Sequence, residues 1–211
     1  MVSVKTHLSV IDDGFATNTY IVTDEETGEV AVVDPGVNDE ELIEKIKGSK
    51  VKYILLTHGH FDHIGGVNFV KDRTGAKVVI HREDEEMLND SEKNCGNNTD
   101  PVFADILVED GSKIMLGNSE ITDLHTPGHT KGGVCYIFRK DRVLFSGDTL
   151  FKLTAGRTDL YGGNPRTELM SLEKIGELDG DYKVYPGHDD STTLDFERKY
   201  NRYMRIRLKR K

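Results

Sequence analysis

The sequence of 211 residues predicts an α+β fold, in which strands form a four-layer sandwich with helices on the outside. Short segments rich in β-branched and aromatic residues open the chain, and strands then alternate with amphipathic helical segments. A loose two-fold rhythm of strands, a histidine-containing loop and a helix occurs in each half. Hydrophobic residues make up 36% and charged residues 31% of the chain, as in a globular protein with one core. Residues 1–211 are therefore expected to form a single domain.

The N-terminal half is expected to begin as an antiparallel β-meander. Its strands are predicted at 2–10, 17–23 and 29–33. Asp34-Pro35-Gly36 ends the third strand in a turn. A helix follows, with Asn38 as its N-cap and Glu41 as the capping-box partner, and Gly48 ends it. Val51–Leu56 is apolar apart from Lys52, which is typical of a central strand buried on both faces.

The remainder of the chain continues this alternation. Helices are predicted at 64–73, 82–89 and 167–178. Strands are predicted at 77–80, 113–116, 120–125, 134–138, 142–145 and 183–185. Gly117-Asn118 is a good hairpin turn. The polar segment 91–101 is interpreted as a solvated loop, with a loop that reaches toward whatever the histidines bind as the alternative. A basic C-terminal helix is expected at about 193–211.

Composition limits the possible partners and the compartment. The formal net charge of −9 argues against a general nucleic-acid binder, although the C-terminal segment is basic. We interpret that segment as a solvated helix face, with an anion-binding arm for a substrate, RNA or an acidic partner as the alternative. Cys95 and Cys135 have no metal-like spacing and are interpreted as free thiols in a reducing compartment. No signal-peptide or membrane-spanning segment is seen, so a cytoplasmic protein without a membrane partner is expected. The sequence does not indicate the oligomeric state.

The segment Thr57-His58-Gly59-His60-Phe61-Asp62-His63 carries the strongest chemical signal. It contains three histidines and one aspartate in six consecutive positions, directly after the apolar run 51–56. Imidazole and carboxylate groups are preferred ligands of divalent metals. A lone histidine is usually structural, but four such groups at a strand end predict a metal site.

Three later strand ends repeat this pattern. The segments are His125-Thr126-Pro127-Gly128-His129-Thr130, Ser146-Gly147-Asp148-Thr149 and Pro186-Gly187-His188-Asp189. In each, a glycine stands just before the candidate ligand, where it removes side-chain bulk and lets the backbone turn sharply. Loops at strand ends gather at one edge of a sheet, so the four loops are expected to meet there. His125 is interpreted as an ordinary strand-end histidine.

Pooling the four loops gives seven candidate ligands. They are His58, His60, Asp62, His63, His129, Asp148 and His188. Seven nitrogen and oxygen ligands exceed what one catalytic metal with an open position takes, and they suit two divalent ions that share a carboxylate. Because the set contains no thiolate, zinc, iron and manganese all suit it, and zinc is the first expectation.

Together these motifs resemble the metallo-β-lactamase superfamily, and within it the glyoxalase II (hydroxyacylglutathione hydrolase) branch. The resemblance covers about residues 7–200 and implies an αββα sandwich. It implies that His58, His60 and His129 hold one metal and that Asp62, His63 and His188 hold the other. Asp148 would bridge the two ions, and Asp62 would also orient the hydroxide between them.

This ligand set predicts the type of reaction. Two cations lower the pKa of a shared water toward neutrality, and the resulting hydroxide attacks an electrophilic carbonyl. A thioester suits this apparatus, because a thiol with a pKa of about 8.5 leaves as thiolate without a general acid. The expected activity is therefore hydrolysis of a small-molecule thioester or a related ester, with Asp62 and Asp148 as catalytic residues.

Two features concern the substrate. Arg157, in the segment 155–163, falls where a basic residue contacts the substrate's anionic group in glyoxalase II, which makes it a candidate substrate-binding residue. Glyoxalase II also carries a C-terminal helical domain that grips glutathione, whereas only residues 192–211 follow Ser191 here. The resemblance therefore does not carry glutathione specificity, and the thiol carrier is not predicted.

Other activities of the same superfamily remain open. A persulfide dioxygenase, an oxidoreductase with one iron, keeps nearly the same histidines, although Gly147-Asp148-Thr149-Leu150-Phe151 and Pro186-Gly187-His188-Asp189 favour the hydrolase. An RNA-processing nuclease is a further alternative, against which the acidic composition and compact length argue. β-Lactam hydrolysis is not expected, because there is no export signal and Asp148 stands where lactamases usually place another ligand.

Overall fold

The computed structural model describes residues 1–12, 14–96 and 100–206. Its longer strands are β1 (Val2–Asp12), β2 (Phe15–Asp24), β3 (Glu29–Val33), β4 (Lys50–Leu55), β5 (Lys77–His81), β7 (Lys113–Leu116), β8 (Ser119–His125), β9 (Val134–Phe138), β10 (Val143–Gly147) and β13 (Lys183–Pro186). Shorter strands are β6 (Ile106–Val108), β11 (Leu150–Phe151), β12 (Thr154–Ala155) and β14 (Thr192–Thr193). The helices are α1 (Glu40–Ile46), α2 (Phe61–Ile64), α3 (Val67–Thr74), the 3₁₀ helix η1 (Arg82–Asn89), α4 (Pro165–Gly176) and α5 (Leu194–Tyr200).

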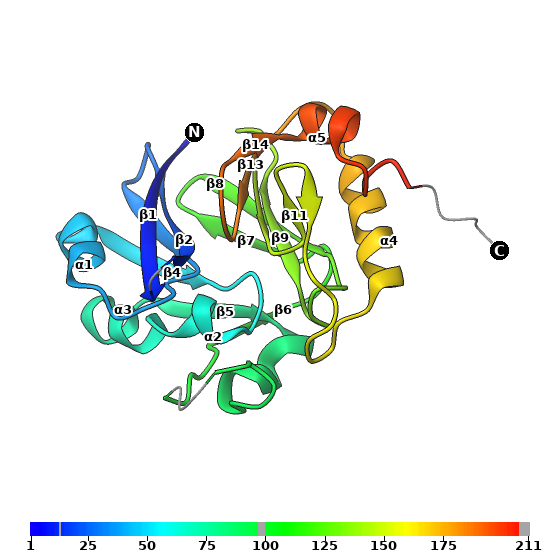
Figure 1. The fold of residues 1–211 in the computed structure, drawn as a ribbon. Helices are drawn as coiled ribbons and strands as arrows, with labels where there is room; N and C mark the ends of the chain where they lie inside the picture. Colours follow the sequence, from blue (N-terminus) through cyan, green and yellow to red (C-terminus); the bar gives the residue numbers. More distant parts are fainter. Residues whose placement is uncertain (13, 97–99, 207–211) are drawn as a thin grey trace.

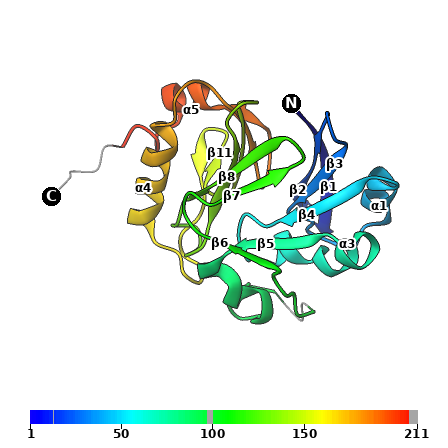
Figure 2. The ribbon, with the colours of Figure 1, turned by 180° about the vertical axis from the view of Figure 1, so that it is seen from behind.

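Two six-stranded sheets form the centre of the molecule (Figure 1). The first has the order β1-β2-β3-β4-β5-β6, antiparallel at its N-terminal end and parallel from β3 onward. The second has the order β14-β13-β10-β9-β8-β7 and contains the parallel pair β10–β13. Figures 1 and 2 show α1 and α3 outside the first sheet and α4 outside the second. The predicted α+β sandwich with outer helices is confirmed.

The apolar core has three layers, as four stacked layers of structure require. One lies between the sheets, one between the first sheet and its helices, and one between the second sheet and α4 and α5. Strand β4 illustrates the arrangement, since Leu55 faces the other sheet and Ile54 faces the helices. Side chains alternate across a strand, so a strand buried on both faces must be apolar throughout.

Two predicted helices differ from those observed. Helix α1 begins one residue later than expected, because Asp39 rather than Asn38 is the N-cap and accepts a hydrogen bond from the backbone N–H of Glu41. The helix predicted at 64–73 begins only at Val67, as α3, and a separate short helix α2 spans Phe61–Ile64 in the histidine segment that was expected to be a loop; Gly65-Gly66 separates the two. A Cβ at Gly66 would lie 2.2 Å from the carbonyl oxygen of Val37, so this close approach of two backbones requires glycine.

The C-terminal helix is shorter than the predicted 193–211. Helix α5 ends at Tyr200, and residues 207–211 lie outside the described part of the chain. Asn201 stops the helix because its buried amide donates to the carbonyl oxygen of Thr154 at 2.9 Å and to the carboxylate of Glu197 at 2.9 Å. The extended backbone at Asn201 follows from this anchoring. Within the described residues, no helix has the length and apolar character needed to cross a membrane.

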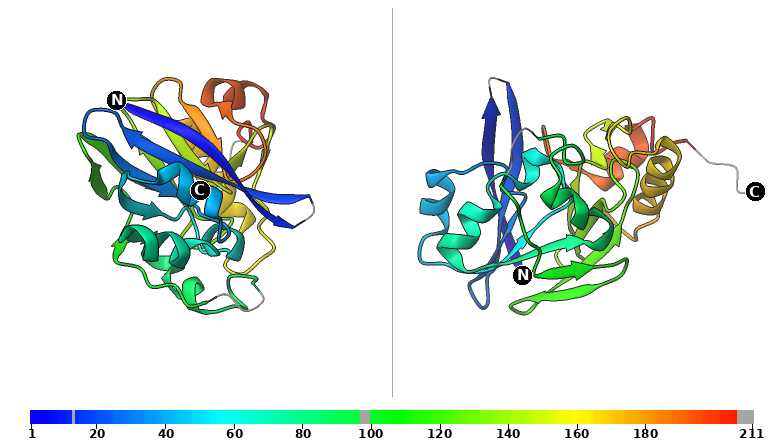
Figure 3. Two further views of the ribbon diagram at one scale, coloured as in Figure 1. Left: turned by 90° about the vertical axis from the view of Figure 1, so that its left-hand side faces the viewer. Right: turned by 90° about the horizontal axis from the view of Figure 1, so that it is seen from below.

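The loops that carry the candidate ligands meet at one edge of the sandwich. They follow β4, β8, β10 and β13, so both sheets contribute to the same edge. The long β1–β2 hairpin projects beside this region (Figure 3). Strand β2 of this hairpin contacts the loop that follows β13 in the second sheet. The backbone N–H of Asn18 donates to the carbonyl oxygen of Gly187 at 2.7 Å.

Candidate metal centre

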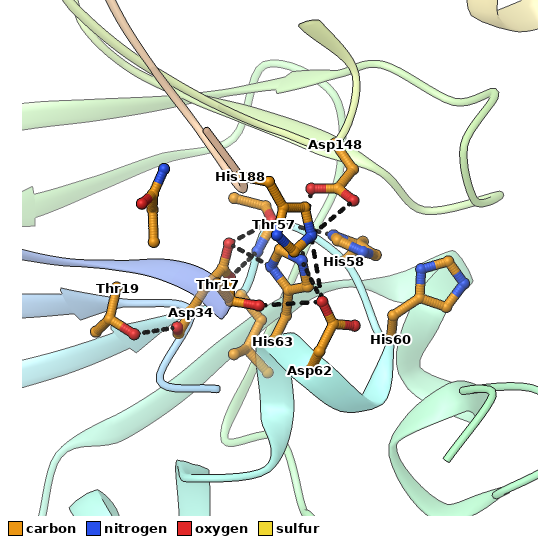
Figure 4. A network of polar contacts seen from close by, with 12 residues as sticks. Thr17, Thr19, Asp34, Thr57, His58, His60, Asp62, His63, Asp148 and His188 are labelled. Atoms are coloured by element: carbon orange, nitrogen blue, oxygen red, sulfur yellow. Dashed lines mark hydrogen bonds and ion pairs between the residues drawn. The ribbon is translucent and has the colours of Figure 1, made fainter. Parts of the chain in front are cut away.

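All seven candidate ligands lie together. Figure 4 labels all of them except His129. Two groups of three have ligand atoms within 4.8 Å of one another. The first group is His58, His60 and His129, and the second is Asp62, His63 and His188. Asp148 lies between them and also forms a group with His58 and His63.

The two oxygens of Asp148 face both groups. Its Oδ1 lies 3.4 Å from His63 Nε2, and its Oδ2 lies 3.5 Å from His129 Nε2 and 3.4 Å from His188 Nε2. Asp62 belongs to the second group, with its Oδ2 3.2 Å from His188 Nε2. A carboxylate placed between two clusters of imidazoles is the arrangement that a bridging ligand requires.

The buried polar atoms of the site fit metal ions. His58 Nε2, His60 Nε2, His63 Nε2 and Asp148 Oδ1 are buried without a hydrogen-bond partner. A buried polar atom without a partner is costly, and several in one place indicate a ligand-binding site. The donor set contains only nitrogen and oxygen, which suits zinc, iron or manganese.

Several imidazoles are oriented through their second nitrogen. His63 Nδ1 contacts Asp34 Oδ2 at 3.0 Å, His129 Nδ1 contacts the carbonyl oxygen of Arg157 at 2.8 Å, and His188 Nδ1 contacts that of Ala16 at 2.8 Å. Each acceptor favours the tautomer with the proton on Nδ1, so the Nε2 lone pair faces the site. This pattern is typical of metal-binding histidines.

Asp34 is a site residue that the sequence analysis treated only as part of a turn. It is buried at the end of β3 and accepts hydrogen bonds from Thr57 through the backbone N–H at 2.8 Å and Oγ1 at 2.6 Å, in addition to its contact with His63. Its place after an apolar strand, like those of the ligand loops, was the available signal. Thr17 is another residue that contacts a ligand and was not identified from the sequence. Its hydroxyl donates to Asp62 Oδ2 at 3.0 Å.

The two halves of the site differ in charge. Burial, together with the neighbouring His63, lowers the pKa of His58 well below its ordinary value, and burial lowers that of His60 to about 3. Burial also lowers the pKa of His63, but Asp62 and Asp148 outweigh it and the net pKa lies well above the ordinary value. His58 and His60 are therefore neutral imidazoles, whereas His63 lies beside the carboxylates of Asp62 and Asp148.

Helix α4 fixes the loop that carries His129. The backbone N–H of Asn164 donates to the carbonyl oxygen of Gly128 at 2.8 Å, and Ser171 Oγ donates to that of Pro127 at 2.6 Å. Gly128 has a φ of +146°, and a Cβ there would lie 2.3 Å from the Cα of Glu168. Glycine is therefore required here, as predicted from its place before a ligand.

Two residues of the sequence analysis lie away from the ligands. His125 stacks on His81 with ring centroids 4.0 Å apart and contacts the carbonyl oxygen of Lys131. The Arg157 side chain is exposed and forms a two-point ion pair with Asp159, at 2.7 Å and 2.8 Å. Its substrate-binding role stays a prediction, whereas its carbonyl oxygen orients His129.

A cavity of about 470 Å³ opens onto the centre. This volume lies within the range of small-molecule sites. Five of the candidate ligands line it: His60, Asp62, His129, Asp148 and His188. The remaining lining residues are Phe15, Phe61, Cys95, Phe151, Thr154, Ala155, Arg157, Leu160 and Asp189.

Comparison with known proteins decides the family. Residues 12–188 match the family described as the metallo-beta-lactamase superfamily. The chain belongs to this superfamily. Among curated relatives of this superfamily member, a probable metallo-hydrolase from Streptococcus pyogenes is 34% identical over 87% of the chain and 84% of the relative. Hydroxyacylglutathione hydrolase from Maricaulis maris is 36% identical over 81% of the chain and 61% of that enzyme.

Solved structures extend this likeness. BLEG-1 B3 metallo-β-lactamase has a TM-score of 0.86 and 34% identity, and the match covers 96% of this chain and 99% of that one. TTHA1623, crystallised in a di-iron-bound form, has a TM-score of 0.80 and 30% identity over 92% of this chain and 98% of that one. The superfamily and the metallo-β-lactamase fold are thus established, and the relatives indicate a metal-dependent hydrolase.

Proposed function

We propose that this protein hydrolyses thioesters with the help of two divalent metal ions, as the glyoxalase II branch of the superfamily does. The observation that carries the proposal is Asp148, which lies between two clusters of ligands and faces both. The name of the Maricaulis maris relative supports the thioester.

Different residues of the site have different roles in the proposed reaction. Metal ions held by the two clusters would supply a hydroxide at neutral pH and polarise the substrate carbonyl. The carboxylate of Asp62, fixed by the hydroxyl of Thr17, would accept a hydrogen bond from the attacking water and so orient it. The Nδ1 contacts of His63, His129 and His188 would keep their Nε2 atoms available throughout.

The leaving group favours a thioester over an amide. Among the described cavity residues outside the ligand set, the groups that exchange protons are Cys95 and Asp189. An amide nitrogen has to be protonated as it leaves, which calls for a placed proton donor. A thiol with a pKa of about 8.5 leaves as the anion, so it needs no such donor.

Replacement of Asp148 by alanine tests the proposal. We expect the metal-loaded wild type to hydrolyse members of a panel containing S-lactoylglutathione, acyl-CoA and acyl-N-acetylcysteamine thioesters. Asp148→Ala should reduce kcat/KM at least about a thousandfold, because the bridging charge is lost. Asp179→Ala, the same change at a fully exposed carboxylate, is the matched control and should retain full activity. Full activity of Asp148→Ala would exclude a two-metal mechanism.

β-Lactam hydrolysis is a second candidate, because BLEG-1 B3 metallo-β-lactamase is 34% identical over nearly the whole chain. A penicillin, a cephalosporin and a carbapenem therefore belong in the same panel. Lactam turnover faster than thioester turnover would replace the first proposal. Oxygen consumption with glutathione persulfide by protein containing a single iron would instead favour the dioxygenase alternative.

A further inference from the structure

The entrance to the metal centre is lined by phenylalanines. The ring of Phe15 is stacked on that of His188 with centroids 5.3 Å apart and lies 6.4 Å from the ring of Phe61. Phe151 approaches His188 from its own strand, with centroids 6.1 Å apart. Phe15 is 37% exposed although it is aromatic, and it stands at the start of β2 in the projecting hairpin (Figure 3). These side chains present an apolar wall beside the ligands.

Outside the ligand set, the described side chains of this entrance leave no unpaired cation for an anionic substrate group. Arg157 is the one cation among the described cavity residues, and both its Nε and its Nη2 are engaged by the carboxylate of Asp159. Lys152, next in sequence to Phe151, is paired with Asp190 at 2.9 Å. Asp189 adds a negative charge to the wall. A carboxylate on the substrate would therefore compete with carboxylates that are already in place.

We propose that this entrance selects thioesters carrying an uncharged, apolar group next to the scissile carbonyl, rather than anionic thioesters such as those of glutathione. The inference rests on the proposed function and specifies its substrate class. The apolar group would lie against Phe15 and Phe151, and the carbonyl would face the ligands. Phe15 and Phe151 then act as specificity-determining residues.

Binding of unhydrolysable analogues tests this preference separately from catalysis. Thioethers of N-acetylcysteamine with S-alkyl chains of two to eight carbons are titrated into the metal-loaded protein by calorimetry. We expect Kd to fall about twofold to fourfold per added methylene, as burial of apolar surface predicts. Analogues ending in a carboxylate should bind more weakly than uncharged analogues of the same length. Equal affinity across the series would overturn the inference.

The source of the selectivity is tested by substitution. Phe15→Ala and Phe151→Ala should flatten the dependence of Kd on chain length. Phe103→Ala is the matched control, because Phe103 is 69% exposed and does not line the cavity, and it should leave the dependence unchanged. Asp159→Asn frees Arg157 and should improve the binding of carboxylate-bearing analogues. A wild type that prefers those analogues, and loses the preference in Arg157→Ala, would contradict the assignment.

Thioester hydrolysis then locates the apolar group. One series varies the acyl chain on N-acetylcysteamine, and a second varies the thiol among N-acetylcysteamine, glutathione and coenzyme A with a fixed acyl group. A dependence of kcat/KM on chain length in the first series places the apolar group on the acyl side, and a dependence in the second places it on the thiol side. If kcat/KM depends neither on the acyl chain length nor on the thiol, the inference about the apolar group is wrong and the proposed function still stands. Failure to hydrolyse any thioester, with analogue binding still selective, overturns the proposed function and leaves the apolar preference of the cavity standing.

Discussion

Asp34 shows how a residue that is not a ligand can control one. Its carboxylate contacts His63 Nδ1 and accepts two hydrogen bonds from Thr57, so it couples the end of β3 to the ligand loop. We expect Asp34→Asn to keep the fold but to weaken metal binding about 10- to 100-fold, because the negative charge that supports His63 is lost. Competition with a chromophoric chelator measures this affinity.

The control for that change is Asp24→Asn. Asp24 is also buried and accepts hydrogen bonds from Ser119 and Thr27, but it lies at the other end of β2 from the site. This variant should lose stability without any change in metal affinity. Equal metal affinity in Asp34→Asn and the wild type would show that His63 does not depend on Asp34.

Asp123 predicts a pH dependence of stability. Burial, reinforced by Asp110, raises the pKa of Asp123 to about 7, and both its carboxylate oxygens are buried without a partner. The unfolded chain ionises this group from about pH 4, so the free energy of unfolding falls between about pH 4 and pH 7 and then levels off. Asp123→Asn cannot ionise and should raise the free energy of unfolding by up to about 4 kcal/mol at pH 8, with little effect at pH 4.

Urea unfolding of the wild type and Asp123→Asn at pH 4, 6 and 8 measures this difference. Asp179→Asn, at a fully exposed carboxylate, should show no such trend. A stability difference between Asp123→Asn and the wild type that stays constant with pH would show that the carboxyl does not titrate in this range.

At the scale of elements, the break between α2 and α3 sets the position of the ligand helix. Gly66 lies against the carbonyl oxygens of Val37 and Pro35, so the turn after β3 is in contact with the segment that carries Asp62 and His63. We expect Gly66→Ala to destabilise the protein by about 1–3 kcal/mol, because two backbone segments must move apart. Thermal unfolding is the measurement.

Gly176→Ala provides the matched glycine substitution. Gly176 is the last residue of α4, and the nearest atom to an added Cβ is the flexible Met204 Cε at 3.3 Å. Alanine favours helix over glycine, so this variant should be as stable as the wild type or slightly more so. Similar losses in both variants would show that the contact with Val37 is not the cause.

At the scale of the whole molecule, much of the site could be predicted because each ligand loop follows a largely apolar strand, and in the three later loops a glycine stands just before the ligand. Periodicity also predicted the layers of the sandwich, since β4 is apolar on both faces. The break at Gly65-Gly66 could not be predicted, because it results from a contact with residues distant in the sequence. The role of Asp34 was not predicted, because Asp34-Pro35-Gly36 was interpreted only as a turn. The role of Phe15 was not predicted, because the β1–β2 hairpin brings it to His188, which is distant in the sequence.

The charge asymmetry of the site also emerges only from the assembled molecule. The segment 58–63 contributes His58 and His60 to one cluster and Asp62 and His63 to the other, and it is the later loops that separate the two. His129 completes the first cluster, and Asp148 joins it to the second.

The metal content of the protein tests the central claim most directly. The purified chain is loaded with excess zinc, dialysed and analysed by mass spectrometry of the metal together with an accurate protein concentration. The account predicts two ions per chain in the wild type and at most one in Asp148→Ala, because Asp148 faces both clusters. A single ion in the wild type, or two retained in Asp148→Ala, would contradict it.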